Sequence, residues 1–271
     1  MNIAITTDSA INLYASTLIC ALSRGGFTPA CVVSVEKSKA AKLRHELKRN
    51  GVASTFRKAV GSRYSVASPH GDPFSYLRDY AAAHNLDAWN TSLPILSTKL
   101  GIEYLSTENV NSEFTVKSIM DRDIDIVVNA GGGIFRKAIV MAPKIGILNA
   151  HMGFLPTFRG MNVLEWSLFH RHNPGVTLHF IDTGIDTGNI LLFRKIELCM
   201  ADTIDSLRAK ALPVSVEAVT EGVRGLADGS LRAVSQRPQD GEQYFVMHER
   251  LKRVAEKNIA ALVESRITQS P

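Results

Sequence analysis

Short apolar runs and amphipathic segments alternate at the start of the chain. Residues 2–6 form an apolar run, and residues 13–22 carry apolar side chains at helical spacing. Gly25 and Gly26 follow, as is typical at the end of a helix. The Val-rich run 29–35 then predicts a second strand. A strand, a helix and a strand in this order predict a parallel sheet with helices on its faces.

The next segment has a polar and basic pattern. Residues 39–50 predict a charged helix that ends at Gly51, and residues 52–70 predict a loop or an insertion. Basic residues are densest from 37 to 63, where a solvated helix face followed by a basic loop is the simplest interpretation.

The rest of the pattern continues to alternate strands with helices. A helix is expected to start at Asp72 as its N-cap, with Pro73 at the first helical position and apolar residues 74, 77 and 81 on its buried side. Further strands are expected at 102–106, 124–128, 145–149, 175–180 and 190–197, and further helices at 111–120, 163–170 and 203–229 with a bend at Pro213. The sequence therefore predicts an α/β fold with a mostly parallel sheet.

A single catalytic domain is expected over residues 1–200. Residues 201–271 are expected to be a long helix and a small helical or extended tail, because the last forty or so residues are too few for a second domain.

The composition is that of an ordinary globular protein, with 45% hydrophobic and 21% charged residues. No apolar run reaches the roughly 18 residues of a membrane span, and the N-terminus lacks a signal-peptide pattern, so a cytoplasmic protein is expected. Cys20, Cys31 and Cys199 are widely spaced, which predicts reduced, buried thiols rather than a disulfide framework or a zinc site. The net charge of +5 does not require a nucleic-acid partner.

Polar residues suited to catalysis stand at the end of an apolar strand. Asn149 and His151 lie two residues apart, so both side chains leave the same side of an extended backbone. Open α/β sheets bind ligands at the carboxyl ends of their strands. Downstream, a tight loop carries Asp182 and Asp186. An amide, a histidine and a carboxylate suit acyl transfer to an amine, because this reaction needs a stabilised oxyanion and a positioned proton carrier.

Each of these residues also has a structural interpretation. A single histidine after a strand is most often a satisfied structural residue, Asn149 can cap a turn, and either aspartate can close an Asx turn. The glycine run 131–133 is neither the dinucleotide GxGxxG motif nor a Walker motif. His170 and His172 point to different faces near a helix end, so no metal site is expected there.

Taken together, the motifs resemble one protein family. The pattern comprises Asn149-x-His151-x-Gly153-x-Leu155-Pro156, Arg159-Gly160, Gly175-Val176-Thr177, His179, Ile181-Asp182 and Ile185-Asp186-Thr187-Gly188. It resembles the folate-dependent formyltransferases, which include glycinamide ribonucleotide transformylase, methionyl-tRNA formyltransferase and the sugar N-formyltransferases. The resemblance is specific over residues 124–197, weaker over 1–35, faint at 243–248, and absent from 36 to 100.

The resemblance implies a Rossmann-like three-layer αβα fold, 10-formyltetrahydrofolate as the formyl donor and no metal. The catalytic residues of the family fall on Asn149, His151 and Asp186. Asp182 is the competing carboxylate. Asp186 is preferred because, as in the family, it directly precedes a small residue and a glycine.

The resemblance also places the two substrates. The pterin is expected between a strand-end loop and the loop that carries the aspartates, in contact with Gly132, Gly133, Ile134, Phe135, Val140, Gly184 and Ile185. The acceptor pocket is expected to include Arg159, Asn162 and Trp166. A core position for Trp166 and a surface clamp for Arg159 are the alternative.

Departures from the family pattern reduce the number of acceptor classes that are expected. Glycinamide ribonucleotide transformylase holds a phosphate with a Gly-Ser-Asn turn after its first strand, where this chain has Asp-Ser-Ala-Ile-Asn at residues 8–12. An acid without a glycine makes a poor anion site, so a purine-pathway role is not expected. The additional C-terminal domain of the methionyl-tRNA enzymes and the N-terminal regulatory domain of the hydrolases are not expected either.

The sequence thus favours formyl transfer to the primary amine of a small molecule, with a nucleotide-linked amino sugar as the expected acceptor. The alternatives are a methionyl-tRNA formyltransferase with a reduced C-terminal region, a formyltetrahydrofolate hydrolase, and a folate-binding module without activity. Neither a membrane nor nucleic acid is expected as a partner, and a homodimer formed through the C-terminal tail stays open.

Overall fold

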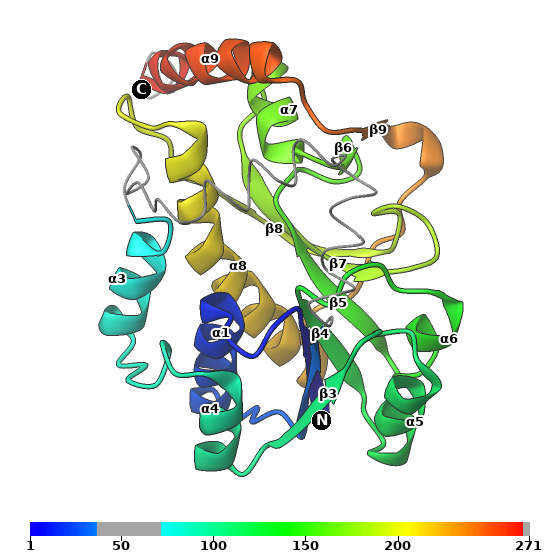
Figure 1. Ribbon diagram of the computed structural model, residues 1–271. Coiled ribbons are helices and arrows are strands. Elements are labelled where there is room, and N and C mark those ends of the chain that lie inside the picture. Colours follow the sequence, from blue (N-terminus) through cyan, green and yellow to red (C-terminus); the bar gives the residue numbers. More distant parts are fainter. Residues whose placement is uncertain (37–71, 268–271) are drawn as a thin grey trace, which may run out of the picture.

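The computed structural model describes residues 1–36 and 72–267 (Figure 1). The expected helix at 39–50, the expected loop at 52–70 and the basic stretch 37–63 lie outside the described residues. The strands are β1 (Ile3–Thr7), β2 (Cys31–Val35), β3 (Glu103–Thr107), β4 (Ile126–Ala130), β5 (Gly146–His151), β6 (Phe158–Gly160), β7 (Gly175–Ile181), β8 (Ile190–Lys195) and β9 (Glu242–Tyr244). The helices are α1 (Leu13–Arg24), α3 (Ser75–Ala83), α4 (Leu93–Leu100), α5 (Glu113–Asp121), α6 (Lys137–Val140), α7 (Val163–Phe169), α8 (Ile204–Ala227) and α9 (Glu249–Ile267), with a 3₁₀ turn at Pro238–Asp240.

Seven strands form one sheet in the order β3-β2-β1-β4-β5-β7-β8. The strands from β3 to β5 pair in parallel, whereas β7 is antiparallel to both β5 and β8. All residues of β1 and β2 are buried, as expected for strands that are covered on both faces. The predicted α/β fold with a mostly parallel sheet is confirmed.

Two apolar clusters lie on opposite faces of the sheet. Alternation along β1 sends Ile3 and Ile5 into one cluster and Ala4 into the other. The larger cluster includes residues of α1, α3, α4 and α8, and the smaller one includes residues of α5 and α6. Figure 1 shows these two groups of helices on the two sides of the sheet, which makes the three layers of the fold.

The N-terminus of α8 is held by a capping box. Thr203 accepts a hydrogen bond from the amide of Ser206, and the Ser206 hydroxyl accepts one from the amide of Thr203. The helix continues through Pro213 as predicted and crosses the sheet beside β7. Gly222 permits this contact, since an added Cβ atom would lie 2.1 Å from the Leu178 side chain.

Some expected boundaries were wrong. The helix α3 starts at Ser75 with Phe74 as its N-cap, and Asp72 instead accepts a hydrogen bond from the Phe74 amide in the preceding turn. Cys199 is exposed, so only part of the expectation of buried thiols holds. The helices α4, α6 and α9 were not predicted individually from the sequence.

The C-terminal segment returns to β6 and α7. The strand β9 pairs in parallel with β6, and α9 packs against α7 through Ala255, Ile259 and Leu262, which belong to the main core (Figure 1). The division into residues 1–200 and 201–271 stays a prediction. No helix of the described residues is long and apolar enough to cross a membrane.

We expect the buried centre of the sheet to set the stability of the fold. Ile5→Ala removes a fully buried side chain from β1 and should lower the free energy of unfolding by about 2–5 kcal/mol. Ile95→Ala on α4 is the control, because Ile95 is 55% exposed and should change stability by less than about 0.5 kcal/mol. Urea unfolding measures the free energy of unfolding of both variants, and an equal decrease in the two would contradict the assignment of the core.

Candidate active site

A row of three polar side chains crosses the sheet near the carboxyl end of β5. Asn149 pairs in register with Asn129 of β4 on one side and with His179 of β7 on the other. Directly paired residues project from the same face of a sheet, so the three side chains meet. Asn129 Nδ2 donates to Asn149 Oδ1 over 3.0 Å, and Asn149 Nδ2 donates to His179 Nε2 over 3.1 Å.

Backbone contacts orient both ends of this row. The Asn129 side-chain oxygen Oδ1 accepts hydrogen bonds from the backbone amides of Gly131 and Gly132, which follow β4. His179 Nδ1 lies 2.8 Å from the Phe180 carbonyl oxygen, which can only accept, so Nδ1 carries the proton and Nε2 accepts from Asn149. The amide of Asn149 is therefore held in a single orientation by its two neighbours.

His151 is buried and lies two residues after Asn149, at the end of β5. Its Nε2 donates to the Phe158 carbonyl oxygen over 2.8 Å, and its Nδ1 lies 3.5 Å from Asp186 Oδ2. Both ring nitrogens thus face oxygen atoms. This arrangement suits an imidazole that gains a proton from the carboxylate side and returns it.

Asp186 reaches the row from the loop between β7 and β8. Its backbone is left-handed, with φ of 53°, and its Oδ2 accepts a hydrogen bond from the Gly160 amide over 2.8 Å. Its Oδ1 lies 3.7 Å from His179 Nε2. Gln236 Nε2 donates to its carbonyl oxygen over 3.1 Å. The carboxylate therefore stands between the two histidines, in a position fixed from three other segments.

Asp182 has a different environment in the same loop. Its carboxylate accepts hydrogen bonds from the Gly184 amide over 2.9 Å and from the Thr187 hydroxyl over 2.7 Å. These contacts close an Asx turn. A Cβ atom added at Gly188 would lie 1.9 Å from the Phe180 carbonyl oxygen, so only glycine lets the loop return this closely to β7. The geometry favours Asp186 as the partner of His151.

His179 was not among the residues expected from the sequence to form the site. The pKa of His179 is lowered to about 4, first by burial and then by the nearby His151, while Asp186 acts in the opposite direction. His179 therefore stays neutral near pH 7 and can accept the hydrogen bond from Asn149. Its register opposite Asn149 on an antiparallel strand could have identified it, but the sequence does not give that register.

The donor atoms of His151, His179 and Asp186 also lie within 4.8 Å of one another, and they are the one group in the described part of the chain that could hold a metal ion.

Two cavities meet at Asn149. The first has a volume of about 200 Å³ and is lined by Asn149, His179 and Asp186, and by five of the residues expected to bind the pterin, Gly133, Ile134, Phe135, Gly184 and Ile185. The other two expected residues do not line it. Gly132 lies behind the loop, where an added Cβ atom would lie 2.8 Å from the Thr6 hydroxyl oxygen, and Val140 on α6 packs against the smaller apolar cluster.

The second cavity has a volume of about 290 Å³ and is also lined by Asn149. His151, Gly160 and Asn162 line it, together with Glu165 and Arg208. Of the three residues expected at the acceptor pocket, Asn162 therefore borders the second cavity.

Arg159 and Trp166 hold the C-terminal segment instead. Arg159 Nη2 donates to the Gly241 carbonyl oxygen over 2.6 Å, and Trp166 Nε1 donates to that of Phe245 over 2.9 Å. Trp166 also packs on the ring of Tyr244. These contacts agree with the structural alternative for both residues.

The turn after β1 is occupied by its own side chains. Asn12 caps α1 by accepting from the Ala15 amide, and its Nδ2 donates to Asp8 Oδ1 and to the Ala130 carbonyl oxygen, both over 3.0 Å. The position that would cradle a phosphate thus holds a carboxylate and an amide that are bonded to each other.

The formyl transferase family model matches residues 1–223. The chain belongs to the formyl transferase family. The resemblance found in the sequence is therefore confirmed.

Individual relatives agree with this assignment. Methionyl-tRNA formyltransferase of Lachnospira eligens is 28% identical over 193 residues, which cover 70% of this chain and 56% of the relative. The chain spans about half the length of the curated relatives it matches.

Solved structures share the fold at low identity. Glycinamide ribonucleotide transformylase 1 from Symbiobacterium toebii is 18% identical, with a TM-score of 0.56, and the match covers 87% of this chain and 94% of the other. The N-formyltransferase from Helicobacter canadensis, solved with folinic acid and dTDP-3-aminofucose, is 14% identical with a TM-score of 0.54, covering 98% of this chain and 82% of the other.

We expect His179 to make stability depend on pH. Its folded-state pKa of about 4 lies below the unfolded value of about 6.5, so the unfolded chain binds a proton in this window that the folded protein does not. The free energy of unfolding should fall as pH decreases from about 6.5 to about 4. Urea unfolding across this range should show a shallower fall for His179→Gln, and parallel curves for the two proteins would contradict the lowered pKa.

Proposed function

We propose that this protein transfers a formyl group from 10-formyltetrahydrofolate to the primary amine of a small molecule. The observation that carries the proposal is the meeting of Asn149, His151 and Asp186 at the boundary between two cavities. The first cavity, beside the loop of residues 131–135 (the glycine loop), binds the pterin, and the second cavity, beside Asn162, binds the amine. The formyl carbon then lies next to Asn149, which lines both.

The glycine loop supports the assignment of the folate side. Its wall is formed by Gly133, the exposed Ile134 and the buried Phe135, opposite Gly184 and Ile185. Backbone amides and carbonyls between apolar side chains suit a flat heterocycle with hydrogen-bonding edges. When bound, 10-formyltetrahydrofolate supplies the formyl group, and its N10 leaves with a proton.

Each residue of the chain then has a separate role. A neutral amine attacks the formyl carbon, a C–N bond forms, and the carbonyl oxygen gains negative charge. Asn149 Nδ2 has two N–H groups and gives one to His179, so the second is assigned to this oxyanion. Asp186 and His151 take the proton lost by the attacking nitrogen and return it to N10 as the old C–N bond breaks.

His179 is a positioning residue in this mechanism. Because it is neutral, its Nε2 accepts from Asn149 and turns the amide group toward the cavity. Both ring nitrogens of His151 already face Phe158 and Asp186, so we assign His151 to proton transfer and the oxyanion to the Asn149 amide.

We propose a nucleotide-linked amino sugar as the acceptor. The Helicobacter canadensis enzyme, which shares the fold, was solved with such a sugar and with folinic acid. The bonded pair Asp8 and Asn12 argues against a phosphate after β1, and thereby against glycinamide ribonucleotide.

Methionyl-tRNA is the second candidate acceptor, because methionyl-tRNA formyltransferases are the curated relatives found by sequence. Hydrolysis of the donor without an acceptor is the third possibility for the same site.

The proposal is tested by incubating the purified protein with 10-formyltetrahydrofolate and a panel of nucleotide-linked amino sugars. We expect an acceptor to gain the mass of one formyl group. His151→Ala should lower the rate by about 100-fold or more, because it removes the proton carrier. Release of formate with no formylated amine would instead indicate a hydrolase, and transfer only to methionyl-tRNA would support the second candidate.

The two aspartates should differ in their effects. Asp186→Asn removes the charge beside His151 and should lower kcat by at least about 100-fold. Asp182→Asn should lower it by less than about 10-fold, since an asparagine can still close the Asx turn with Gly184. Steady-state kinetics of the two variants decides, and a larger loss for Asp182→Asn would reverse the assignment.

A further inference from the structure

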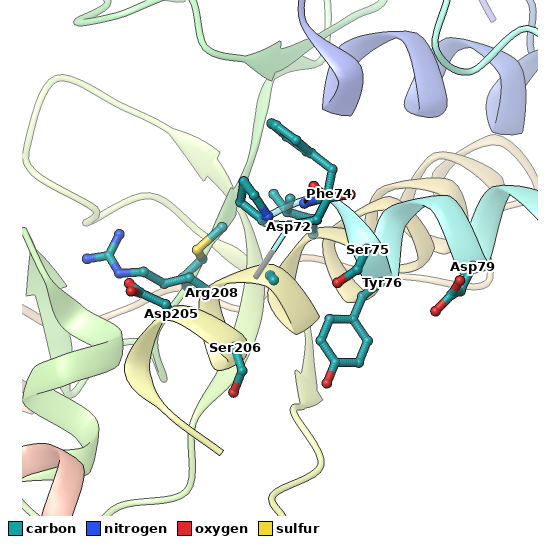
Figure 2. A pocket seen from close by; sticks show the side chains of 12 residues that line it. Asp72, Phe74, Ser75, Tyr76, Asp79, Asp205, Ser206 and Arg208 are labelled. Carbon is teal, nitrogen blue, oxygen red and sulfur yellow. Dashed lines mark hydrogen bonds between the residues drawn. The ribbon is translucent and has the colours of Figure 1, made fainter. Parts of the chain in front are cut away.

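A third and larger cavity, of about 780 Å³, lies between the start of α3 and the first turns of α8 (Figure 2). It adjoins the acceptor-side cavity, because Met152 and Arg208 line both. The two neighbouring cavities, which together are called the cleft below, extend from His151, past Arg208, to Phe74 and Tyr76. An acceptor with its amine at His151 has room to extend along this cleft.

Arg208 stands at the junction of the two parts. Among the described residues that line them, it is the one lysine or arginine, whereas Asp72, Asp79 and Asp205 line the larger part. Two further cations of the described chain lie beside the larger part without lining it: Arg78 pairs with Asp72, and Lys210 Nζ lies 5.7 Å from the centre of the Tyr76 ring and pairs with Asp202. Arg208 is therefore the cationic side chain that the described walls of both cavities offer to an anionic group of an acceptor.

A buried carboxylate holds Arg208 in place. Arg208 Nη2 donates to Glu165 Oε1, which also accepts from Asn162 Nδ2 over 3.0 Å. Asn162 is itself fixed, because its Oδ1 accepts from the Met247 amide. Glu165 is fully buried, so its position depends on the fold rather than on solvent. A guanidinium group has five N–H donors, and this contact uses one of them.

The far part of the cleft suits a flat ring with N–H groups. Phe74, Tyr76 and Met152 give it aromatic and thioether surfaces, and Asp79 and Asp205 add hydrogen-bond acceptors (Figure 2). A carboxylate accepts hydrogen bonds from the N–H groups at the edge of a nucleobase. A diphosphate, which has no N–H donor, does not fit this part.

We propose that Arg208, positioned by Glu165, binds the phosphate groups of a nucleotide-linked acceptor, and that the cavity between α3 and α8 binds its base. This inference rests on the proposed formyl transfer and adds the residue that selects an anionic acceptor. The amine end lies at His151, the phosphates at Arg208 and the base in the cavity that Phe74 and Tyr76 line. Planar guanidinium groups bind phosphate oxygens through two parallel hydrogen bonds, which also fixes the direction of the ligand.

Binding of UDP and of dTDP to the whole protein, measured by calorimetry without a formyl donor, tests the inference. We expect Arg208→Gln to weaken binding by about 10- to 100-fold and Arg208→Lys to weaken it less. Lysine keeps the positive charge but lacks the planar group that makes two parallel hydrogen bonds. Arg224→Gln is the matched control. Arg224 is an exposed arginine near the other end of α8 and lines neither part of the cleft. Its loss should leave binding unchanged.

Uridine separates the phosphate from the base. It should bind more weakly than UDP and equally to the wild type and to Arg208→Gln, since it has no phosphate. With an acceptor that the wild type formylates, Arg208→Gln should mainly raise KM and should affect kcat much less. If UDP and dTDP bind Arg208→Gln as tightly as the wild type, or do not bind the wild type at all, the inference is wrong.

Removal of Arg208 leaves the buried charge of Glu165 without its partner and can destabilise the fold. The double variant Glu165→Gln, Arg208→Gln restores neutrality and should show the same loss of UDP binding with a folded circular dichroism spectrum. If this variant is folded and binds UDP normally, Arg208 has no role in recognition.

Binding of 5-formyltetrahydrofolate separates failure of this inference from failure of the proposed function. The folate-side cavity does not include Arg208, so all four variants should bind this folate as the wild type does. Folate binding without nucleotide binding would overturn only the role of Arg208. A wild type that binds neither compound would overturn the proposed function as well.

Discussion

The hydrogen bonds from Asn129 through Asn149 to His179 determine how the polar end of the sheet is arranged. They require a neutral His179, and burial supplies this condition by opposing the charged form of the ring. Because the row crosses three adjacent strands, its geometry is set by the register of the sheet and not by flexible loops. In the proposed reaction the Asn149 amide that faces the formyl carbon is thus oriented before any substrate arrives, which reduces the reorganisation needed during reaction.

A second constraint joins the row to two distant segments. Asp186 occupies a left-handed backbone position in the loop after β7, and the Gly160 amide fixes its carboxylate. Gly160 belongs to β6, which pairs with β9 near the C-terminal end of the described chain. A Cβ atom at Gly160 would lie 2.2 Å from the Tyr244 carbonyl oxygen, so this pairing needs a glycine. The C-terminal segment therefore supports the carboxylate through β6, although it contributes no residue to the folate-side cavity.

The sequence predicted those features that depend on local pattern. Apolar runs identified the buried strands, and the spacing of Asn149 and His151 placed a site at the end of β5. His179 belongs to the motif that carries the family resemblance, but it was given no role, because a single histidine in a buried strand has the same local pattern whether it is structural or functional. The pairing with Asn149 separates the two. The sequence did not single out Arg208, the residue proposed to bind phosphate, since a charged residue on a long helix usually faces solvent. The helix α9, whose apolar positions are few, gains its place from packing on α7.

The two sides of the site are built from different kinds of structure, and this difference bears on how specificity arises. The folate side is made from glycine backbone and strand-end loops, where a side-chain change disturbs the catalytic row directly through Asn129. The acceptor side is made from side chains of α3, α7 and α8, which approach the row from outside the sheet. Under the proposed function, substitutions at positions such as Arg208 therefore alter the charge and length of the acceptor without moving Asn149, His151 or Asp186. A fold with this division can keep one reaction while its acceptor changes, because the function depends on the site and not on the fold alone.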